Sequence, residues 1–224
     1  MSDGDGVPAA SAPATRREPS WLRRWTEALL IAFLVVTFVA TTVGIEGNSM
    51  APTLLDGERT IVPRYETWAV RAGLRAWRVG DVVYFRAPGD APRTLLERIS
   101  GGPYVIKRVA ATGGQSVSIE HGRIVVDGDP HADPLPGARP FGGFGVAPTL
   151  VPAGHLYVLG DDRSPLGSRD SRVFGTVPGE SVAGRAAWVV WPLLRVDEAG
   201  AWRWNVRRVP RRRGGSACAR RGRS

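Results

Sequence analysis

An uncharged apolar stretch near the N-terminus most constrains how this chain can fold. It runs for 18 residues, from Ala28 to Ile45. At a rise of about 1.5 Å per residue, a helix of this length just crosses a hydrocarbon core about 30 Å thick. Trp21 and Trp25 precede the stretch, and tryptophan side chains favour the interface between lipid and water. The stretch therefore predicts a transmembrane anchor over residues 28–45.

The charges before this anchor predict its orientation. The four arginines on this side are Arg16, Arg17, Arg23 and Arg24. Basic residues stay on the cytoplasmic side, so we expect residues 1–27 to form a disordered basic segment in the cytoplasm and the rest to lie outside. A cleaved secretory signal is the alternative. Signal cores are usually shorter, however, and Gly44-Ile45-Glu46 offers no small-x-small cleavage site.

The net charge of +9 originates at the C-terminal end of the chain. Residues 203–224 contain nine arginines and no acidic residue, whereas the remaining residues carry 21 basic and 21 acidic side chains. We therefore expect a neutral folded body without a nucleic-acid partner, and a disordered Arg-rich tail over residues 203–224 that could rest on anionic lipid. The single cysteine, Cys218, lies in this tail and the three histidines are scattered. We expect no disulfide, metal site or cofactor.

After the anchor, the sequence changes to short runs rich in β-branched residues. Gly, Pro and Asp separate these runs, which is typical of strands joined by turns. We expect strands at residues 81–85, 104–109, 117–119, 123–126, 156–159 and 186–191, one helix over 66–78, and a long excursion from the sheet over 127–148. The predicted fold class is mainly β, with an antiparallel sheet in an extracytoplasmic domain over residues 46–202.

Lys107 differs in kind from the other basic residues, because it is the only lysine beside 29 arginines. Arginine stays protonated in proteins, whereas a desolvated lysine can lose its proton near neutrality and act as a base. The predicted strand around Lys107 supplies the apolar neighbours Val105, Ile106 and Val109. Burial among such residues would destabilise the ammonium and lower the pKa of Lys107 by several units.

Four sequence blocks surround this lysine along the chain. They are Gly47-Asn48-Ser49-Met50-Ala51-Pro52-Thr53-Leu54, Gly80-Asp81-Val82-Val83-Tyr84-Phe85, Gly160-Asp161-Asp162-Arg163 and Ser168-Arg169-Asp170-Ser171-Arg172-Val173-Phe174-Gly175. In order and character, these blocks resemble those of the type I signal peptidases, which are membrane-anchored serine proteases that remove secretory signal peptides. The resemblance extends from the anchor to about Trp191. It implies an antiparallel β-sheet catalytic domain of the signal peptidase type.

The resemblance implies that Ser49 is the nucleophile and Lys107 its general base. The chemistry agrees, because a serine hydroxyl attacks poorly until a base removes its proton, and a Ser/Lys pair is a known variant of the serine triad. Ser168 matches the serine that orients the lysine. Asp170 and Arg172 match a structural brace, with Arg108 as a further partner.

The chain departs from the family pattern in three places. Gly47 stands where some members carry a serine for the oxyanion hole, so this hole would rest on backbone N–H groups, chiefly that of Ser49. The loop between Arg163 and Ser168 is about two residues longer than usual, which bears on the assignment of Ser168. Thr112-Gly113-Gly114-Gln115 replaces the usual Pro-Gly-Asp, a change more typical of a different turn than of different catalysis.

The implied substrates are precursor proteins that carry signal peptides, and the implied second partner is membrane lipid. Signal peptides end in small residues at the first and third positions before the cut. By analogy, Met50, Leu54, Val105 and Ile106 would line two shallow pockets beside an extended peptide that pairs with a strand edge. The same four residues are also consistent with ordinary core.

Two other functions remain open from the sequence, and a third is disfavoured. A dedicated maturation protease could use the same dyad on one precursor. A membrane-anchored β domain could bind peptides without catalysis. A self-cleaving Ser/Lys regulator of the DNA-damage repressor kind is disfavoured, because it should be soluble and carry a helical DNA-binding domain.

Overall fold

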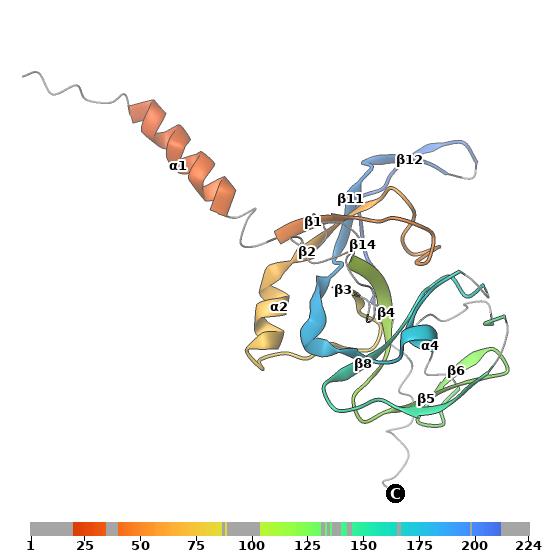
Figure 1. Cartoon of the computed structure of the whole chain (residues 1–224). Coiled ribbons are helices and arrows are strands. Elements are labelled where there is room, and N and C mark those ends of the chain that lie inside the picture. Colours follow the sequence, from red (N-terminus) through yellow and green to blue (C-terminus); the bar gives the residue numbers. More distant parts are fainter. Residues whose placement is uncertain are drawn as a thin grey trace, which may run out of the picture.

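The computed structural model describes residues 20–34, 40–86, 88, 104–130, 133, 135, 140–142, 145–164, 167–197 and 199–211. The chain begins with helix α1 (Ser20–Leu34) and continues into strand β1 (Ala40–Gly44). The remaining elements are β2 (Arg59–Pro63), α2 (Arg64–Arg71), β3 (Val82–Arg86), β4 (Tyr104–Thr112), β5 (Ser116–Glu120), β6 (Arg123–Val126), β7 (Val146–Leu150), β8 (His155–Leu159), α4 (Ser171–Phe174), β9 (Val177–Pro178), the 3-10 turn η2 (Gly179–Ser181), β10 (Val182–Arg185), β11 (Trp188–Trp191), β12 (Leu194–Val196), β13 (Trp202–Trp204) and β14 (Arg207–Arg208). Figure 1 shows their arrangement.

The strands form antiparallel sheets, which confirms the prediction of a mainly β protein. The larger sheets have the strand orders β10-β3-β4-β8-β9 and β1-β2-β11-β14. A third sheet, β6-β5-β7, and the hairpin β12-β13 complete the described strands. β4 is central to the five-stranded sheet, where it pairs with β3 along its first half and with β8 along its second half.

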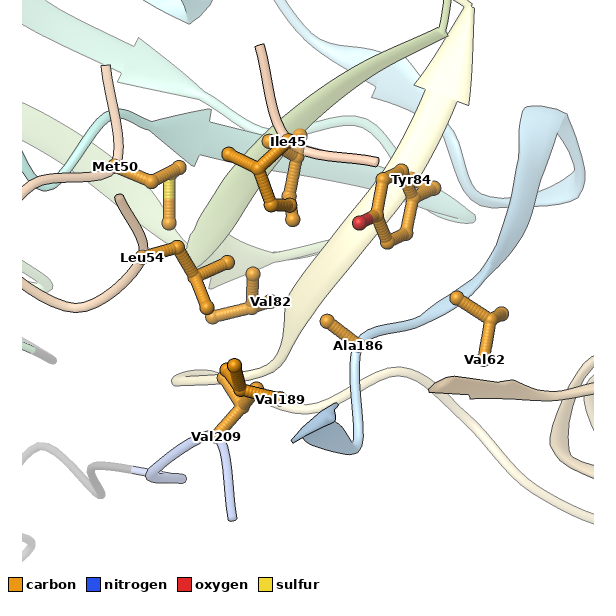
Figure 2. Close-up of a cluster of buried hydrophobic side chains, with 10 residues drawn as sticks. Ile45, Met50, Leu54, Val62, Val82, Tyr84, Ala186, Val189 and Val209 are labelled. Carbon is orange, nitrogen blue, oxygen red and sulfur yellow. The ribbon is translucent and has the colours of Figure 1, made fainter. Parts of the chain in front are cut away.

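Three hydrophobic clusters hold these sheets together. The cluster in Figure 2 joins residues of β2, β3 and β11 to Met50 and Leu54, and it includes Ile45 and Val209 from opposite ends of the described domain. β-branched and aromatic side chains fit such pleated, buried surfaces, which is why the Val-rich runs of the sequence became strands. The predicted strands around Lys107 and in β3, β5, β6, β8 and β11 are present.

The prediction of one continuous helix over residues 28–45 is wrong at its C-terminal end. α1 ends at Leu34, and residues 40–44 form β1, which pairs with β2 from Ala40 opposite Pro63 to Gly44 opposite Arg59. Thr41, Thr42 and Val43 are β-branched, which favours this strand over a helix. Among the described residues, no helix is both long and apolar enough to cross a bilayer.

The prediction of a disordered tail from residue 203 is also wrong for its first nine residues. Residues 202–204 form β13 and residues 207–208 form β14, which pairs with β11. Val209 is 6% exposed and belongs to the core. Residues 212–224, with Cys218, lie outside the described part of the chain.

Two further predictions need smaller corrections. The helix expected over residues 66–78 is α2, which ends at Arg71. The excursion expected over residues 127–148 includes the start of β7. This strand pairs with β5, where Leu150 lies opposite Ser116. Much of this excursion lies outside the described residues.

Candidate active site

Ser49 lies in the loop that joins β1 to β2. Backbone hydrogen bonds close the base of this loop, where Ile45 N donates to the Glu58 carbonyl at 2.8 Å and Gly57 N donates to the Ile45 carbonyl at 3.0 Å. Gly47 has a φ of 81°, a conformation that suits glycine, and its N–H donates to the Asp56 carboxylate at 2.7 Å. The Gly47 N–H is therefore already occupied. The Ser49 N–H, in contrast, donates to no acceptor among the described residues.

Lys107 reaches this loop from the middle of β4. Its side chain is buried, with 4% of the residue exposed, and Nζ donates to Ser49 Oγ at 2.8 Å. Burial lowers the pKa of Lys107 to about 8, although the charges of Asp170 and Asp161 act in the opposite direction. Removal of water from the ammonium therefore outweighs two nearby carboxylates. A lysine with this pKa holds a substantial neutral fraction near physiological pH.

Each of these two carboxylates has an arginine partner. Arg108 binds Asp161 with two hydrogen bonds of 2.8 and 2.6 Å, and both side chains are 1% exposed. Arg172 binds Asp170 at 2.8 and 3.0 Å, and Asp170 also accepts from Gly160 N at 3.0 Å. The arginines compensate the carboxylate charges that would otherwise favour a protonated Lys107.

The contact between Asp170 and Arg172 agrees with the expected brace, and only the place of Arg108 differs. Asp170 and Arg172 bind each other, whereas Arg108 binds Asp161 and not Asp170. Asp161 and Gly160 were not singled out from the sequence. Their position next to the predicted strand over residues 156–159, in a block shared with the family, was the signal that could have identified them.

Ser168 makes no hydrogen bond to Lys107 within the part of the chain that the structure describes. Its hydroxyl is buried and has no hydrogen-bond partner among the described residues. Gly160 separates it from Ser49: a Cβ added at Gly160 would meet Ser168 Oγ at 2.2 Å and the Ser49 carbonyl at 2.7 Å. Only glycine fits here, and it lets the Ser168 loop pack directly against the Ser49 loop.

Most of the residues expected to line substrate pockets belong to the core. Met50 and Leu54 are 0% exposed and lie in one cluster with Ile106, which favours the alternative that these residues are ordinary core. Val105 is partly buried against a different cluster. A cavity of about 380 Å³ lies elsewhere, lined by Thr41, Val43, Val62, Arg64, Thr67, Trp68, Arg71, Tyr84, Tyr104 and Ala183.

The excursion after β6 also contacts the brace, which the sequence did not indicate. The guanidinium groups of Arg172 and Arg163 lie 4.6 and 4.2 Å from the ring centre of Phe141. Such contacts are attractive and hold the arginines in place. Within the described residues, no group of His, Cys, Asp and Glu has the arrangement of a metal site.

A buried lysine amine contacts a serine hydroxyl where two antiparallel sheets meet, and a Ser/Lys pair is a known variant of the serine hydrolase triad. The family model described as signal peptidase, peptidase S26, matches residues 19–191. The chain therefore belongs to the signal peptidase family, and the resemblance seen in its sequence blocks is confirmed.

Individual relatives agree with this assignment. The chain is 32% identical over 178 residues to a probable signal peptidase I-1 of Synechocystis sp., which covers 78% of this chain and 83% of the relative. It is 32% identical over 173 residues to signal peptidase I of Leptolyngbya laminosa, covering 77% of this chain and 79% of the relative. It is 29% identical over 237 residues to signal peptidase I of Mycobacterium tuberculosis, covering 87% and 81%.

Proposed function

We propose that this protein is a membrane-anchored serine endopeptidase that removes N-terminal signal peptides from secreted precursors after small-x-small sites. Ser49 is the nucleophile and Lys107 the general base. The observation that carries this proposal is the 2.8 Å contact between Lys107 Nζ and Ser49 Oγ at a buried amine. Membership of the signal peptidase family supplies the substrate class.

The depressed pKa lets Lys107 begin the reaction. With a pKa of about 8, roughly a tenth of the amine is neutral at pH 7, against well under a thousandth at the ordinary value of 10.5. The neutral Nζ accepts the Ser49 hydroxyl proton as Oγ attacks the scissile carbonyl. The resulting ammonium then donates a proton to the leaving amine.

The acyl-enzyme is then hydrolysed with the same groups. Water replaces the released peptide, Lys107 takes a proton from it, and the hydroxide adds to the ester carbonyl. Collapse of this second intermediate breaks the bond to Oγ and returns the proton from Lys107 to Ser49. The unoccupied Ser49 N–H is the backbone donor available to the developing oxyanion in both steps.

Two strand edges that lead to the dyad have no neighbour among the described strands, and they offer a place for an extended substrate. β1 is the outer strand of its sheet and leads to Ser49, while the first half of β4 pairs only with β3 among the described strands and leads to Lys107. An extended peptide can add to such edges through backbone hydrogen bonds. The cavity lined by Val43 and Tyr104 lies along both strands and could receive a substrate side chain.

We infer that the protein is attached to a membrane, with the N-terminus in the cytoplasm and the catalytic domain outside, and exposed apolar side chains support the attachment. All residues of α1 from Trp21 to Leu34 are exposed. A second apolar surface lies on the hairpin β12-β13, which projects from the sheets in Figure 1, where Trp202 and Trp204 are 71% and 76% exposed. Tryptophan favours the lipid–water interface, and membrane lipid is the partner that fits both surfaces.

Cleavage of several unrelated secretory precursors by the purified full chain tests the function. We expect the wild type to process most of them and Ser49→Ala to process none while remaining folded. Ser181→Ala, which changes an exposed serine in η2, is the matched control and should match the wild type. Retained cleavage by Ser49→Ala would refute the assigned nucleophile. Cleavage of a single precursor would indicate a dedicated maturation protease, and binding without cleavage would indicate a peptide-binding domain.

The topology has its own test. Protease added outside intact cells should digest the region after Ile45 and leave the first residues intact. Digestion of the N-terminal segment alone would show the opposite orientation.

A further inference from the structure

The segment 205–211 follows the part of the chain that matches the family model, which ends at residue 191. It nevertheless returns to the active site. β14 pairs with β11 at Trp188 and Val189, and Val209 N donates to the Ala187 carbonyl at 3.0 Å. This pairing lays the segment against the loop that carries Ser49.

Arg207 on β14 makes two kinds of contact with that loop. Its Nη2 donates to the Thr53 carbonyl at 3.1 Å and to the Glu58 carboxylate at 2.8 Å, and its Nη1 donates to the other oxygen of Glu58 at 2.9 Å. The Glu58 side chain is 2% exposed. Glu58 also accepts from the Leu55 N–H at 3.1 Å and from the Asn205 side chain at 3.1 Å. Arg195 lies 3.5 Å from the same carboxylate.

The same segment also contacts the residue next to Lys107. The Pro210 carbonyl accepts from Arg108 Nη1 at 3.0 Å, and Arg108 Nη2 in turn donates to Thr53 Oγ1 at 3.2 Å. Thr53 is thus held by its carbonyl from Arg207 and by its hydroxyl from Arg108. The segment therefore connects the loop of Ser49 to the strand of Lys107 through partly buried, charge-assisted hydrogen bonds.

From these contacts we propose that Arg207 is a positioning residue, which holds the Ser49 loop against β4 and so sets the distance between Ser49 Oγ and Lys107 Nζ. This inference rests on the proposed function of the Ser49–Lys107 pair. A flat guanidinium is required, because only a fork can bind the carboxylate of Glu58 with both arms and still reach the Thr53 carbonyl. Displacements of about 1 Å at a reacting pair can lower a rate roughly 100-fold.

The test compares Arg207→Met with Arg208→Met in the full chain in detergent. Arg208 is the next residue on β14, is exposed, and lies over the ring of Trp188 instead of the loop, so its variant removes the same charge from the same strand. With a peptide that spans a cleavage site, we expect Arg207→Met to lower kcat by roughly 10- to 100-fold with KM changed by less than about threefold. Arg208→Met should stay within about twofold of the wild type in both.

A second measurement reports the surroundings of Lys107 directly, through its pKa. Because Lys107 is the only lysine, labelling with ¹³C-lysine gives a single side-chain signal whose titration reports its pKa. In Arg207→Met, a loosened loop admits water and the pKa should rise from about 8 toward 10.5, whereas Arg208→Met should leave it unchanged. A purely structural role of Arg207 would not move this signal.

Arg207→Met could fail to fold, because it leaves Glu58 buried with fewer partners. The double variant Glu58→Gln/Arg207→Met removes that charge and should fold, yet still show the low kcat, because the Thr53 carbonyl has lost its donor. Wild-type kcat and an unchanged lysine titration in either folded variant would overturn the proposal. If instead the wild type cleaves no precursor, the proposed function fails, while the lysine titration still decides whether Arg207 holds the loop.

Discussion

Lys107 and Arg108 are neighbours on β4, both buried, and their surroundings differ completely. Lys107 has one polar contact among the described residues, the hydroxyl of Ser49. Arg108 donates to both oxygens of Asp161, to the carbonyls of Gly80 and Pro210 and to the Thr53 hydroxyl. β4 therefore carries two adjacent basic residues: Lys107, which binds no carboxylate within the described part of the chain, and Arg108, which is fully paired.

The difference follows from what each side chain can do when it loses water. Lysine can release its proton, so burial without a carboxylate contact lowers its pKa and makes the neutral base accessible near pH 7. Arginine cannot, so it is buried only with partners that replace water. The pairing of Asp161 with Arg108 serves both sides, because a carboxylate bound to arginine does less to keep Lys107 protonated. Neutrality at position 107 thus depends on charge compensation at position 108.

The largest effect on activity should come from replacing the lysine, which can release its proton, with an arginine, which cannot. Lys107→Arg places a permanent charge at the serine, where no proton can be accepted. We expect kcat/KM for a signal-peptide substrate to fall by roughly 10³- to 10⁴-fold, the upper range for loss of a general base. Cleavage assays with matched circular dichroism spectra would check this. Activity within tenfold of the wild type would show that no neutral amine is required.

Lys107→Met is the control for folding, and its effect on the free energy of unfolding should depend on pH. A pKa lowered from 10.5 to about 8 means that the buried ammonium costs about 3 kcal/mol below pH 8. The inactive Met variant should therefore unfold less readily than the wild type at pH 7, by up to about 3 kcal/mol. The gap should shrink between pH 8 and 10.5, because the folded wild type is then neutral at this position. A gap independent of pH would contradict the lowered pKa.

Removing the paired cation should affect stability first. Arg108→Met leaves Asp161 buried without its arginine, which costs about 3–5 kcal/mol in denaturant unfolding. Arg108→Met/Asp161→Asn removes both charges and should recover part of that loss. The single variant should also raise the pKa of Lys107, since Asp161 would act on the ammonium without compensation. A stable single variant would mean that the pair contributes little.

The pH dependence of the reaction should report the same amine. The neutral form is active, so kcat/KM should rise about tenfold per pH unit below pH 8 and level off above an apparent pKa of about 8. Titration of the single ¹³C-labelled lysine should give the same midpoint in Ser49→Ala, which lacks the nucleophile but keeps the pocket. A plateau that begins near pH 6, or a lysine signal that titrates near 10.5, would contradict a desolvated base.

Much of the fold and the central pair could be predicted from the sequence because both have local signals. Valine-rich runs between Gly, Pro and Asp indicated the strands, and the single lysine within one such run indicated a special role. β1 was missed because its β-branched residues continue an uncharged apolar stretch and resemble part of a membrane helix. Only the pairing of β1 with β2 distinguishes this strand from the end of a membrane helix.

The prediction of a disordered C-terminal tail was wrong for a related reason. Arg207 and Arg211 stand in a basic run that, read locally, is typical of a solvated tail. Their partners Glu58 and Asp81 are 149 and 130 residues away, and no local pattern connects such residues. The choice between pocket and core could not be made from the sequence, because burial is a property of the assembled core: Met50, next to Ser49, packs into such a core cluster.

The smallest effect on stability should come from Ser168→Ala. The Ser168 hydroxyl is buried without a hydrogen-bond partner among the described residues, so its removal sacrifices no bond and relieves an unsatisfied group. We expect the free energy of unfolding to change by less than about 1 kcal/mol. Ser171→Ala is the matched control, because the Ser171 hydroxyl accepts from the buried Val158 N–H at 2.8 Å and its loss should cost about 1–3 kcal/mol.

The two substitutions should rank in the opposite order when activity is measured instead of stability. Ser168 packs across Gly160 from Ser49, and the family resemblance implies that its hydroxyl orients Lys107. Ser168→Ala should therefore lower kcat by roughly tenfold or more with little change in stability, whereas Ser171→Ala should lower stability with little change in kcat. If Ser168→Ala keeps the full kcat, the longer loop before it has removed this serine from the reaction, and the buried amine of Lys107 needs no partner other than Ser49.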